Sequence, residues 1–277
     1  MENSKWTMAK IITMLDIFSY SFMIRAFESG LIVAIIAPVI GVFLVLKRYS
    51  LIADTLSHVA LAGVAIGLLL NISPLISAIA TAVASSIVID KLRVSKKVFG
   101  ESALAIFLSG SLAIAIILIG LAHGFTVDLF SYLFGSILTV KPFDVLIIGA
   151  LGIAVLLIIL AFYKELLYIT FDEEAAQVSG IPTKGINMLF IILAALTIAL
   201  SIPIVGVLLI AALLVIPALA ALQFKKSFNQ TILIAEAVSI FSVLAGIITS
   251  FYLNLSTGGT IVLITIAIFI VIFLFKK

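Results

Sequence analysis

The sequence predicts an all-α protein, a bundle of eight or nine membrane-spanning helices that forms a single transmembrane domain over residues 1–277. Hydrophobic residues make up 64% of the chain and charged residues only 10%. Several apolar runs reach the roughly 20 residues that a spanning helix needs. The longest stretches without such a run are the N-terminal tail and the loops 123–142 and 163–185, which are too short for a soluble domain.

Nine apolar segments are candidate spans by length and hydropathy. Only Pro203 separates the sixth segment from the seventh, so these two are either separate tilted spans or the arms of a re-entrant turn. The count is therefore eight or nine. The segments are Ala26–Leu46, Leu51–Leu70, Pro74–Ile89, Ser102–Ala122, Phe143–Phe162, Ile186–Ile202, Ile204–Ala221, Ile232–Leu253 and Thr260–Phe275.

Basic residues fall in alternate connections between these segments. The positive-inside rule predicts that those connections and the C-terminus are cytoplasmic. Nine spans then place the N-terminus outside, where residues 1–25 are expected to form an interfacial helix over Ile11–Ile24, too short to cross and interrupted by Asp16. The intervening connections carry only Lys141. The basic residues of the predicted cytoplasmic connections and C-terminus are Lys47, Arg48, Lys91, Arg93, Lys96, Lys97, Lys164, Lys184, Lys225, Lys226, Lys276 and Lys277.

Several function classes are excluded by what the sequence lacks. It has no cysteine, so any metal ligand must be an oxygen or an imidazole nitrogen. It has no glycine-rich phosphate-binding loop, so the chain is not expected to be an enzyme that hydrolyses ATP. The net charge of +3 comes without a basic and aromatic cluster, which argues against nucleic-acid binding. Glu2 and Asp16 interrupt the first apolar stretch, so no cleaved signal peptide is expected.

Asp54 and His58 are ionisable residues inside a predicted span, about one turn from its cytoplasmic end. Four residues apart on a helix, they share one face, with about 5–6 Å between Cβ atoms. A charged carboxylate there costs about 2.5–3.5 kcal/mol, so it needs a partner or a function. Either an internal hydrogen bond locks His58 for packing, or the pair handles a metal ion or a proton.

Carboxylate and imidazole together suit zinc, manganese or ferrous iron, although two ligands alone make a weak site. A two-fold dimer with this helix near its axis would supply four ligands from two copies of Asp54 and His58. Small residues on the same helix allow a neighbouring helix to approach closely. They are Ser57, Gly63 and Gly67.

Two other functions use the same residues. A proton-coupled secondary metal transporter would use Asp54 and His58 as a relay and would need no ATPase. An intramembrane hydrolase would add Ser57 as nucleophile, but adjacent helical residues point about 100° apart, which is a poor geometry for a nucleophile and its base.

The connection 163–185 contains a short helix signal, three acids followed by small residues and ended by Gly180 and Pro182. We expect a cytoplasmic helix on which another protein packs, the alternative being a solvated loop. No function is assigned to the remaining ionisable residues near the spans. His123, close to Asp128, is expected to be interfacial, and Glu236 is expected to snorkel or to pair with Lys225 or Lys226.

Over about Phe22–Leu263 the chain resembles the permease subunits of bacterial ABC importers for zinc, manganese or iron(II). The resemblance implies a type II importer fold in the cell membrane, a paired or homodimeric permease, two separate cytoplasmic ATPase subunits and an extracytoplasmic metal-binding protein. It implies no permanently bound cofactor. The matching segments are Gly41–Gly67, Ser131–Leu138, Phe171–Ile181, Val205–Ala221 and Ser256–Leu263.

The resemblance also assigns residues. The family's metal ligands correspond to Asp54 and His58, and its ATPase coupling helix corresponds to Asp172–Gly180. The coupling residues at matching positions are Asp172, Glu174, Ala176 and Gly180. Three positions depart from the family pattern: Ala53 replaces a usual glycine, Glu173 a common proline and Gly259 a usual proline.

Overall fold

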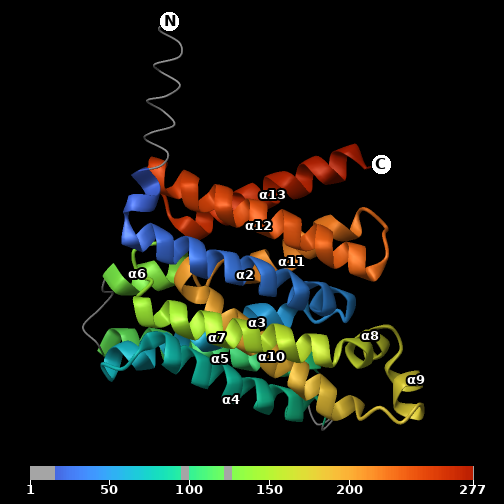
Figure 1. Ribbon diagram of the computed structural model, residues 1–277. Coiled ribbons are helices and arrows are strands. Elements are labelled where there is room, and N and C mark those ends of the chain that lie inside the picture. The colour runs from blue at the N-terminus through green and yellow to red at the C-terminus, as the bar shows by residue number, and fades with distance from the viewer. Residues whose placement is uncertain (1–15, 95–99, 122–126, 277) are drawn as a thin grey trace, which may run out of the picture.

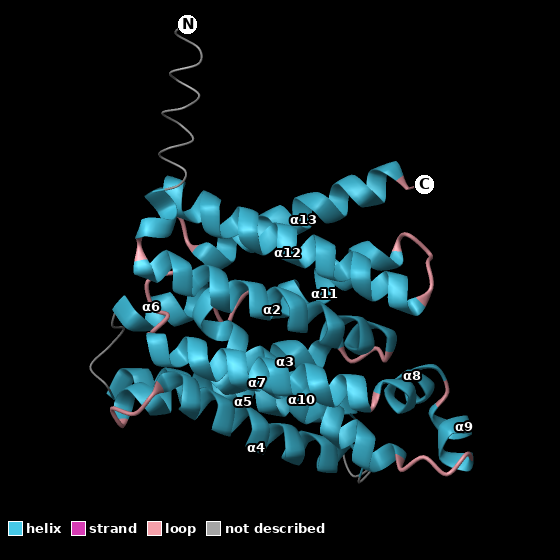
Figure 2. Ribbon diagram, viewed as in Figure 1, coloured by secondary structure: helices cyan, strands magenta, loops and turns pink. Residues whose placement is uncertain are grey.

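The computed structural model describes residues 16–94, 100–121 and 127–276, and these residues form helices joined by short loops, with no strand among them (Figures 1 and 2). The long helices lie side by side and turn back at two opposite ends. The elements are η1 (Asp16–Ser19), α2 (Ser21–Leu46), α3 (Ser50–Leu69), α4 (Pro74–Val94), α5 (Gly100–Leu121), α6 (Val127–Phe134), α7 (Pro142–Ala161), α8 (Tyr163–Phe171), α9 (Glu173–Val178), α10 (Thr183–Val205), α11 (Ile210–Leu222), α12 (Phe228–Leu253) and α13 (Thr257–Phe275).

Eight helices of the described chain are long and apolar enough to span a membrane, which confirms the predicted class. α11 has 13 residues and is therefore about 20 Å long, shorter than a hydrocarbon core of about 30 Å. The non-helical turn 206–209 precedes it, and Gly206 and Val207 in that turn are buried. Irregular backbone is tolerated at membrane depth where protein covers it. The turn and α11 can therefore together carry the chain back across the membrane.

The predicted break at Pro203 is wrong. Pro203 lies inside the last turn of α10, and the helix ends instead at Gly206, whose φ of 82° and ψ of 152° are incompatible with a helix. A proline is tolerated in a membrane helix when other groups satisfy the freed backbone. Pro203 lacks an N–H and so frees only the Ala199 carbonyl, one turn before the helix ends, while its own carbonyl accepts a hydrogen bond from the Ser136 amide at 3.3 Å. Glycine, not proline, ends this helix.

Two other predicted boundaries shift. α2 begins at Ser21, so the end of the predicted interfacial helix Ile11–Ile24 forms the first turn of a span, while residues 1–15 lie outside the described part. α4 continues past the predicted end at Ile89 to Val94. This extension holds because Asp90 is buried against neighbouring helices rather than exposed in a loop.

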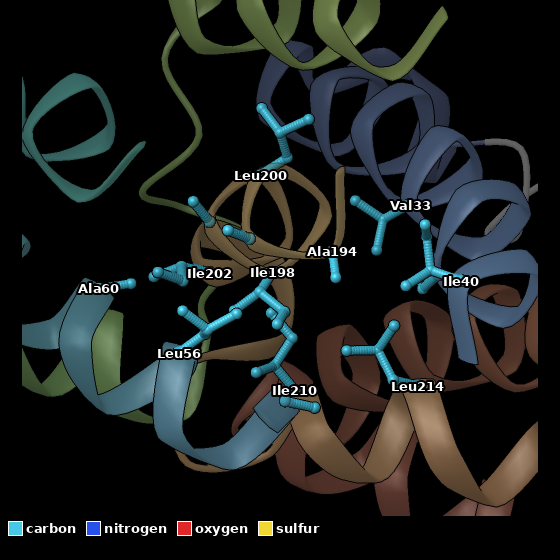
Figure 3. Close-up of a cluster of buried hydrophobic side chains, with 14 of the residues drawn as sticks. Val33, Ile40, Leu56, Ala60, Ala194, Ile198, Leu200, Ile202, Ile210 and Leu214 are labelled. Atoms are coloured by element: carbon cyan, nitrogen blue, oxygen red, sulfur yellow. The ribbon is translucent and has the colours of Figure 1, made fainter. Parts of the chain in front are cut away.

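The core lies between α2, α3, α10 and α11. Figure 3 shows their apolar side chains converging, with Val33 of α2, Leu56 of α3, Ile198 of α10 and Leu214 of α11 among them. In the most apolar window of α10, 78% of residues are buried, against 22% in α5. Large exposed aliphatic side chains on α5, α7 and α13 therefore face lipid or another subunit.

One end of the bundle gathers the basic connections (Figure 1). There the Arg93 guanidinium lies 4.0 Å from the centre of the Tyr49 ring, and the Lys276 ammonium lies 3.8 Å from the centre of the Phe224 ring. α8 and α9 lie at this end too, as does the C-terminus (Figure 1). The described basic connections therefore lie together at one end of the bundle.

Three glycines hold the opposite end together. A Cβ on Gly206 would lie 2.4 Å from the Gly135 amide nitrogen, and one on Gly258 would lie 1.8 Å from the Val205 carbonyl oxygen. The ends of α6 and α10 and the start of α13 are therefore in backbone contact, which only residues without a side chain permit.

Candidate functional site

Asp54 and His58 lie one turn apart on α3, with His58 Nε2 at 3.7 Å from Asp54 Oδ1. This separation is longer than a hydrogen bond. The internal hydrogen bond that a pure packing role would require is therefore absent in this structure. Both atoms remain available to a third group.

The pair occupies an open strip on a helix that is otherwise covered. Between Ile52 and Ala65, every residue of α3 is buried except Asp54 and His58. The Asp54 side chain is 46% exposed and the His58 side chain 13%. Their four-residue spacing keeps both on one face of the helix. The rest of α3 packs against other helices of the chain, whereas this face is accessible to a ligand or to another subunit.

The geometry of the pair is close to that of two ligands of one ion. Ligands at about 2.0–2.1 Å from a tetrahedral zinc ion lie about 3.3 Å apart, and the observed 3.7 Å needs only a small side-chain adjustment. Among the described residues, no third histidine, cysteine, aspartate or glutamate joins them. The described part of one chain therefore offers two protein ligands from side chains of these types.

His58 Nδ1 is buried and has no hydrogen-bond partner among the described residues. A histidine kept for packing would be expected to satisfy this nitrogen, because an unpaired buried polar group costs about 1–3 kcal/mol. A metal bound through Nε2 would leave this nitrogen equally unpaired, so its lack of a partner does not separate packing from ligation.

The small residues of α3 contact other parts of the same chain. A Cβ on Gly63 would lie 2.0 Å from Thr81 Oγ1, and one on Gly67 would lie 2.8 Å from the Pro74 Cα, so both glycines allow α4 to pack closely. Ser57 is fully buried and donates its hydroxyl to the Asp54 carbonyl at 2.7 Å. That bond points the hydroxyl at the backbone, away from the role of a nucleophile activated by His58.

The segment 163–185 folds as two helices rather than one. α8 was not predicted, whereas α9 falls where the short helix was expected. The Asp172 carboxylate accepts a hydrogen bond from the Ala175 amide at 2.9 Å and so caps α9. Ala176 is fully buried and fastens α9 to the bundle, while Gly180, at a φ of 87° in open space, turns the chain away.

The outer side of this segment is exposed. Glu174 is exposed, as are the apolar side chains of Phe171 and Val178, the latter at 89%. Phe171 ends α8 and Val178 ends the capped helix α9, so apolar and acidic side chains lie exposed side by side at this end of the bundle.

A polar network behind α9 was missed by the sequence reasoning. Asn187 of α10 donates to Glu173 Oε1 at 2.7 Å, and its own Oδ1 accepts from the Lys47 ammonium. Burial lowers the pKa of Lys47 from its ordinary value to about 8, although the nearby Glu173 carboxylate opposes this shift. The only local sign of this network in the sequence was Glu173, which stands where the family commonly has a proline. The three partners are far apart in the sequence, so their contact could not be predicted.

The remaining expectations have mixed outcomes. Glu236 lines an apolar groove of about 540 Å³ together with Ile35 and Tyr163. It forms no ion pair within 4 Å with either Lys225 or Lys226, both of which are described, so the pairing alternative is wrong, while the snorkelling alternative stays a prediction. Glu236 lies about two turns into α12, so it is further from this end of the bundle than those lysines. His123 lies outside the described residues.

Comparison with known proteins gives a consistent result. The model of the ABC 3 transport family matches residues 19–276. The chain is 33% identical, over 94% of its length and 89% of the relative, to the manganese transport system membrane protein MntC of Halalkalibacterium halodurans. It is also 33% identical to the high-affinity zinc uptake system membrane protein ZnuB of Haemophilus influenzae, over 93% of the chain and 98% of the relative. Its structure matches PsaBC from Streptococcus pneumoniae, solved in complex with Fab, with a TM-score of 0.84 and 32% identity over 96% of the chain and 95% of the matched chain.

Proposed function

The chain belongs to the ABC 3 transport family, and we propose on that premise that it is a permease subunit that moves a divalent transition-metal ion, zinc or manganese, across the cell membrane. Its similarity to MntC and ZnuB over nearly the whole chain supports this class of cargo. The eight apolar spans supply the membrane passage.

The observation that carries the assignment of the metal path is the open strip of α3. Asp54 and His58 are the unburied residues in the middle of this helix, and their free atoms are 3.7 Å apart. Two copies of the chain, related by a two-fold axis beside α3, would bring together two carboxylates and two imidazoles. Such a nitrogen and oxygen set favours zinc, manganese or iron(II) over calcium and magnesium.

Energy is supplied by separate subunits in this proposal. The chain carries no phosphate-binding loop, so ATP binds to cytoplasmic ATPase chains that dock on α9 and the exposed residues beside it. The basic end of the bundle, with α9 and the C-terminus, then faces the cytoplasm. An extracytoplasmic metal-binding protein delivers the ion to the opposite end. ATP-driven movement of α9 shifts the permease between states open to either side.

A proton-coupled carrier that uses Asp54 and His58 as a relay is not favoured. Its membrane subunit would need no docking helix, whereas α9 is capped, anchored through Ala176 and exposed on its outer side. The family of the chain also supports an ATP-driven system.

The test is ATP-dependent uptake of radiolabelled zinc and manganese into proteoliposomes that hold the chain, its candidate ATPase and its binding protein. Asp54→Asn and His58→Ala should each reduce uptake by at least about tenfold, because they remove a ligand. Glu236→Gln is the matched control, since it neutralises another carboxylate within a span but outside the pair. ATPase assembly should stay intact in all three variants. Unchanged uptake in both Asp54 and His58 variants would return the pair to a packing role.

A further inference from the structure

The loop between α2 and α3 is held from two sides. It comprises Lys47, Arg48 and Tyr49, of which Lys47 caps the end of α2 and Tyr49 precedes α3. The Lys47 ammonium bonds to Asn187 of α10, and the Arg93 guanidinium of α4 stacks on the Tyr49 ring at 4.0 Å. Arg48 adopts a left-handed φ of 57°. A loop this short and this constrained transmits displacement rather than absorbing it.

The same lysine is connected to the coupling segment through one amide. Asn187 donates to Glu173, the first residue of α9, at 2.7 Å and accepts from Lys47 on its other side. Hydrogen bonds that involve charged groups are shorter and stronger than neutral ones. A continuous polar path therefore runs from α9 across α10 to Lys47, at the start of the loop that leads into the helix carrying Asp54.

The surroundings strengthen this path. Lys47 is half-buried, and its ammonium lies 5.2 Å from the centre of the Phe190 ring. Glu173 and Asn187 also line a small, partly open pocket of about 170 Å³. The hydrogen bonds through Asn187 each involve one charged partner and are therefore stronger than neutral ones, so α9, α10 and the loop should move together. The residues that line the pocket are Tyr49, Asp90, Arg93, Glu173, Lys184, Asn187 and Ile191.

We propose that Lys47 is a positioning residue that transmits the movement of α9 to α3, through Asn187, so that an ATPase docked on the coupling segment controls the placement of Asp54 and His58. This inference rests on the proposed function, because it assumes that α9 receives the ATPase. α3 starts directly after the loop, and Asp54 lies about one turn further on. A rigid helix displaced at its end carries such residues with it.

A competing route exists, because α10 also packs directly on α3. The two routes differ in what Lys47 contributes. If apolar packing transmits the movement, neutralising Lys47 has no effect on coupling. If the polar path transmits it, the effect is large even though the fold is intact.

The decisive experiment measures the number of ATP molecules hydrolysed per ion transported in the reconstituted system. Lys47→Met, which keeps length and suits the half-buried position, and Asn187→Leu should each raise this ratio at least about fivefold, the lower end of typical allosteric couplings. The double variant should be no worse than either single variant, because both break the same path. Lys47→Arg should restore part of the coupling. Lys184→Met is the matched control, since Lys184 lines the same pocket without bonding to Asn187.

A second readout does not depend on transport. The chain has no cysteine, so an environment-sensitive fluorophore can be attached through Leu51→Cys, at an exposed position in the first turn of α3. Addition of a non-hydrolysable ATP analogue to the assembled complex should change its emission, and Lys47→Met should remove most of that change. An unchanged ratio and an unchanged emission response in Lys47→Met would overturn the relay. A Lys47-dependent response in a complex that transports no metal would instead overturn the proposed cargo and leave the relay standing.

Discussion

Gly206 and Gly135 bring two chain segments into backbone contact at the end of the bundle opposite α9: a Cβ on Gly206 would lie 2.4 Å from the Gly135 amide nitrogen. Gly206 also ends α10 in a conformation that is essentially restricted to glycine, with φ 82° and ψ 152°. One residue therefore meets two separate requirements, conformational and steric.

Gly206→Ala should destabilise the protein by at least about 1–3 kcal/mol, the cost of a non-glycine residue in this region of φ and ψ. The clash with Gly135 adds to that cost. Thermal unfolding in detergent should show a midpoint about 2–4 °C lower for each kcal/mol lost. Gly110→Ala is the control, because a Cβ there meets nothing within 4 Å and alanine suits a helix. Equal midpoints for the two variants would contradict this account.

Binding of zinc or manganese should raise the unfolding midpoint of the purified chain. A ligand that binds only the folded state adds about 2.7 kcal/mol at a concentration one hundred times its dissociation constant. Asp54→Asn and His58→Ala should each lose this stabilisation, while Glu236→Gln should keep it. A metal-induced shift that survives in both ligand variants would place the ion elsewhere.

Asp172→Ala should weaken the capture of the ATPase. The Asp172 carboxylate satisfies the Ala175 amide, and loss of such a cap costs about 1 kcal/mol, which is considerable for the short helix α9. Co-purification of the ATPase with the permease should fall accordingly. Asp172→Asn is the matched variant, because asparagine caps equally well. If both variants lose the ATPase equally, the charge of Asp172 is what matters, and not its capping bond.

The coupling of ATP hydrolysis to ion transport should weaken as the pH rises from 7 to 9. The pKa of Lys47 lies near 8, so its ammonium loses the proton, and its attraction to Glu173, within this interval. Free energy of unfolding changes in the opposite sense: above pH 8 the unfolded chain, with a lysine pKa near 10.5, binds more protons, so stability rises with pH. The charged groups that face Lys47 are Glu173 on α9, Asp90 and Arg93 on α4, and Lys184 on α10, which lines the same pocket.

The measurement is the ATP-to-ion ratio at pH 7 and pH 9, in wild type and in Lys47→Arg. Arginine stays protonated over this range, so its ratio should change little with pH. An identical pH dependence in the two proteins would assign the effect to another group.

The sequence predicted the class of fold and most helices correctly because each span is a local property of about 20 residues. It was wrong at Pro203, because the proline lies within the last turn of α10 and the backbone conformation of Gly206 ends that helix instead. It ended α4 too early at Ile89, because the burial of Asp90 depends on helices far along the chain. The pair Asp54 and His58 could be found from spacing and membrane cost alone.

What the sequence determined by itself is therefore local: an apolar helical bundle, the alternation of its basic connections, and an ionisable pair on one helical face. The tertiary structure decided which face of α3 stays open, where Gly206 ends α10, and how Glu173 reaches Lys47 through Asn187. Lys47 and Asn187 are 140 positions apart. Hydropathy and helical period act over a few turns, whereas such a contact depends on how whole helices pack, which no single segment specifies.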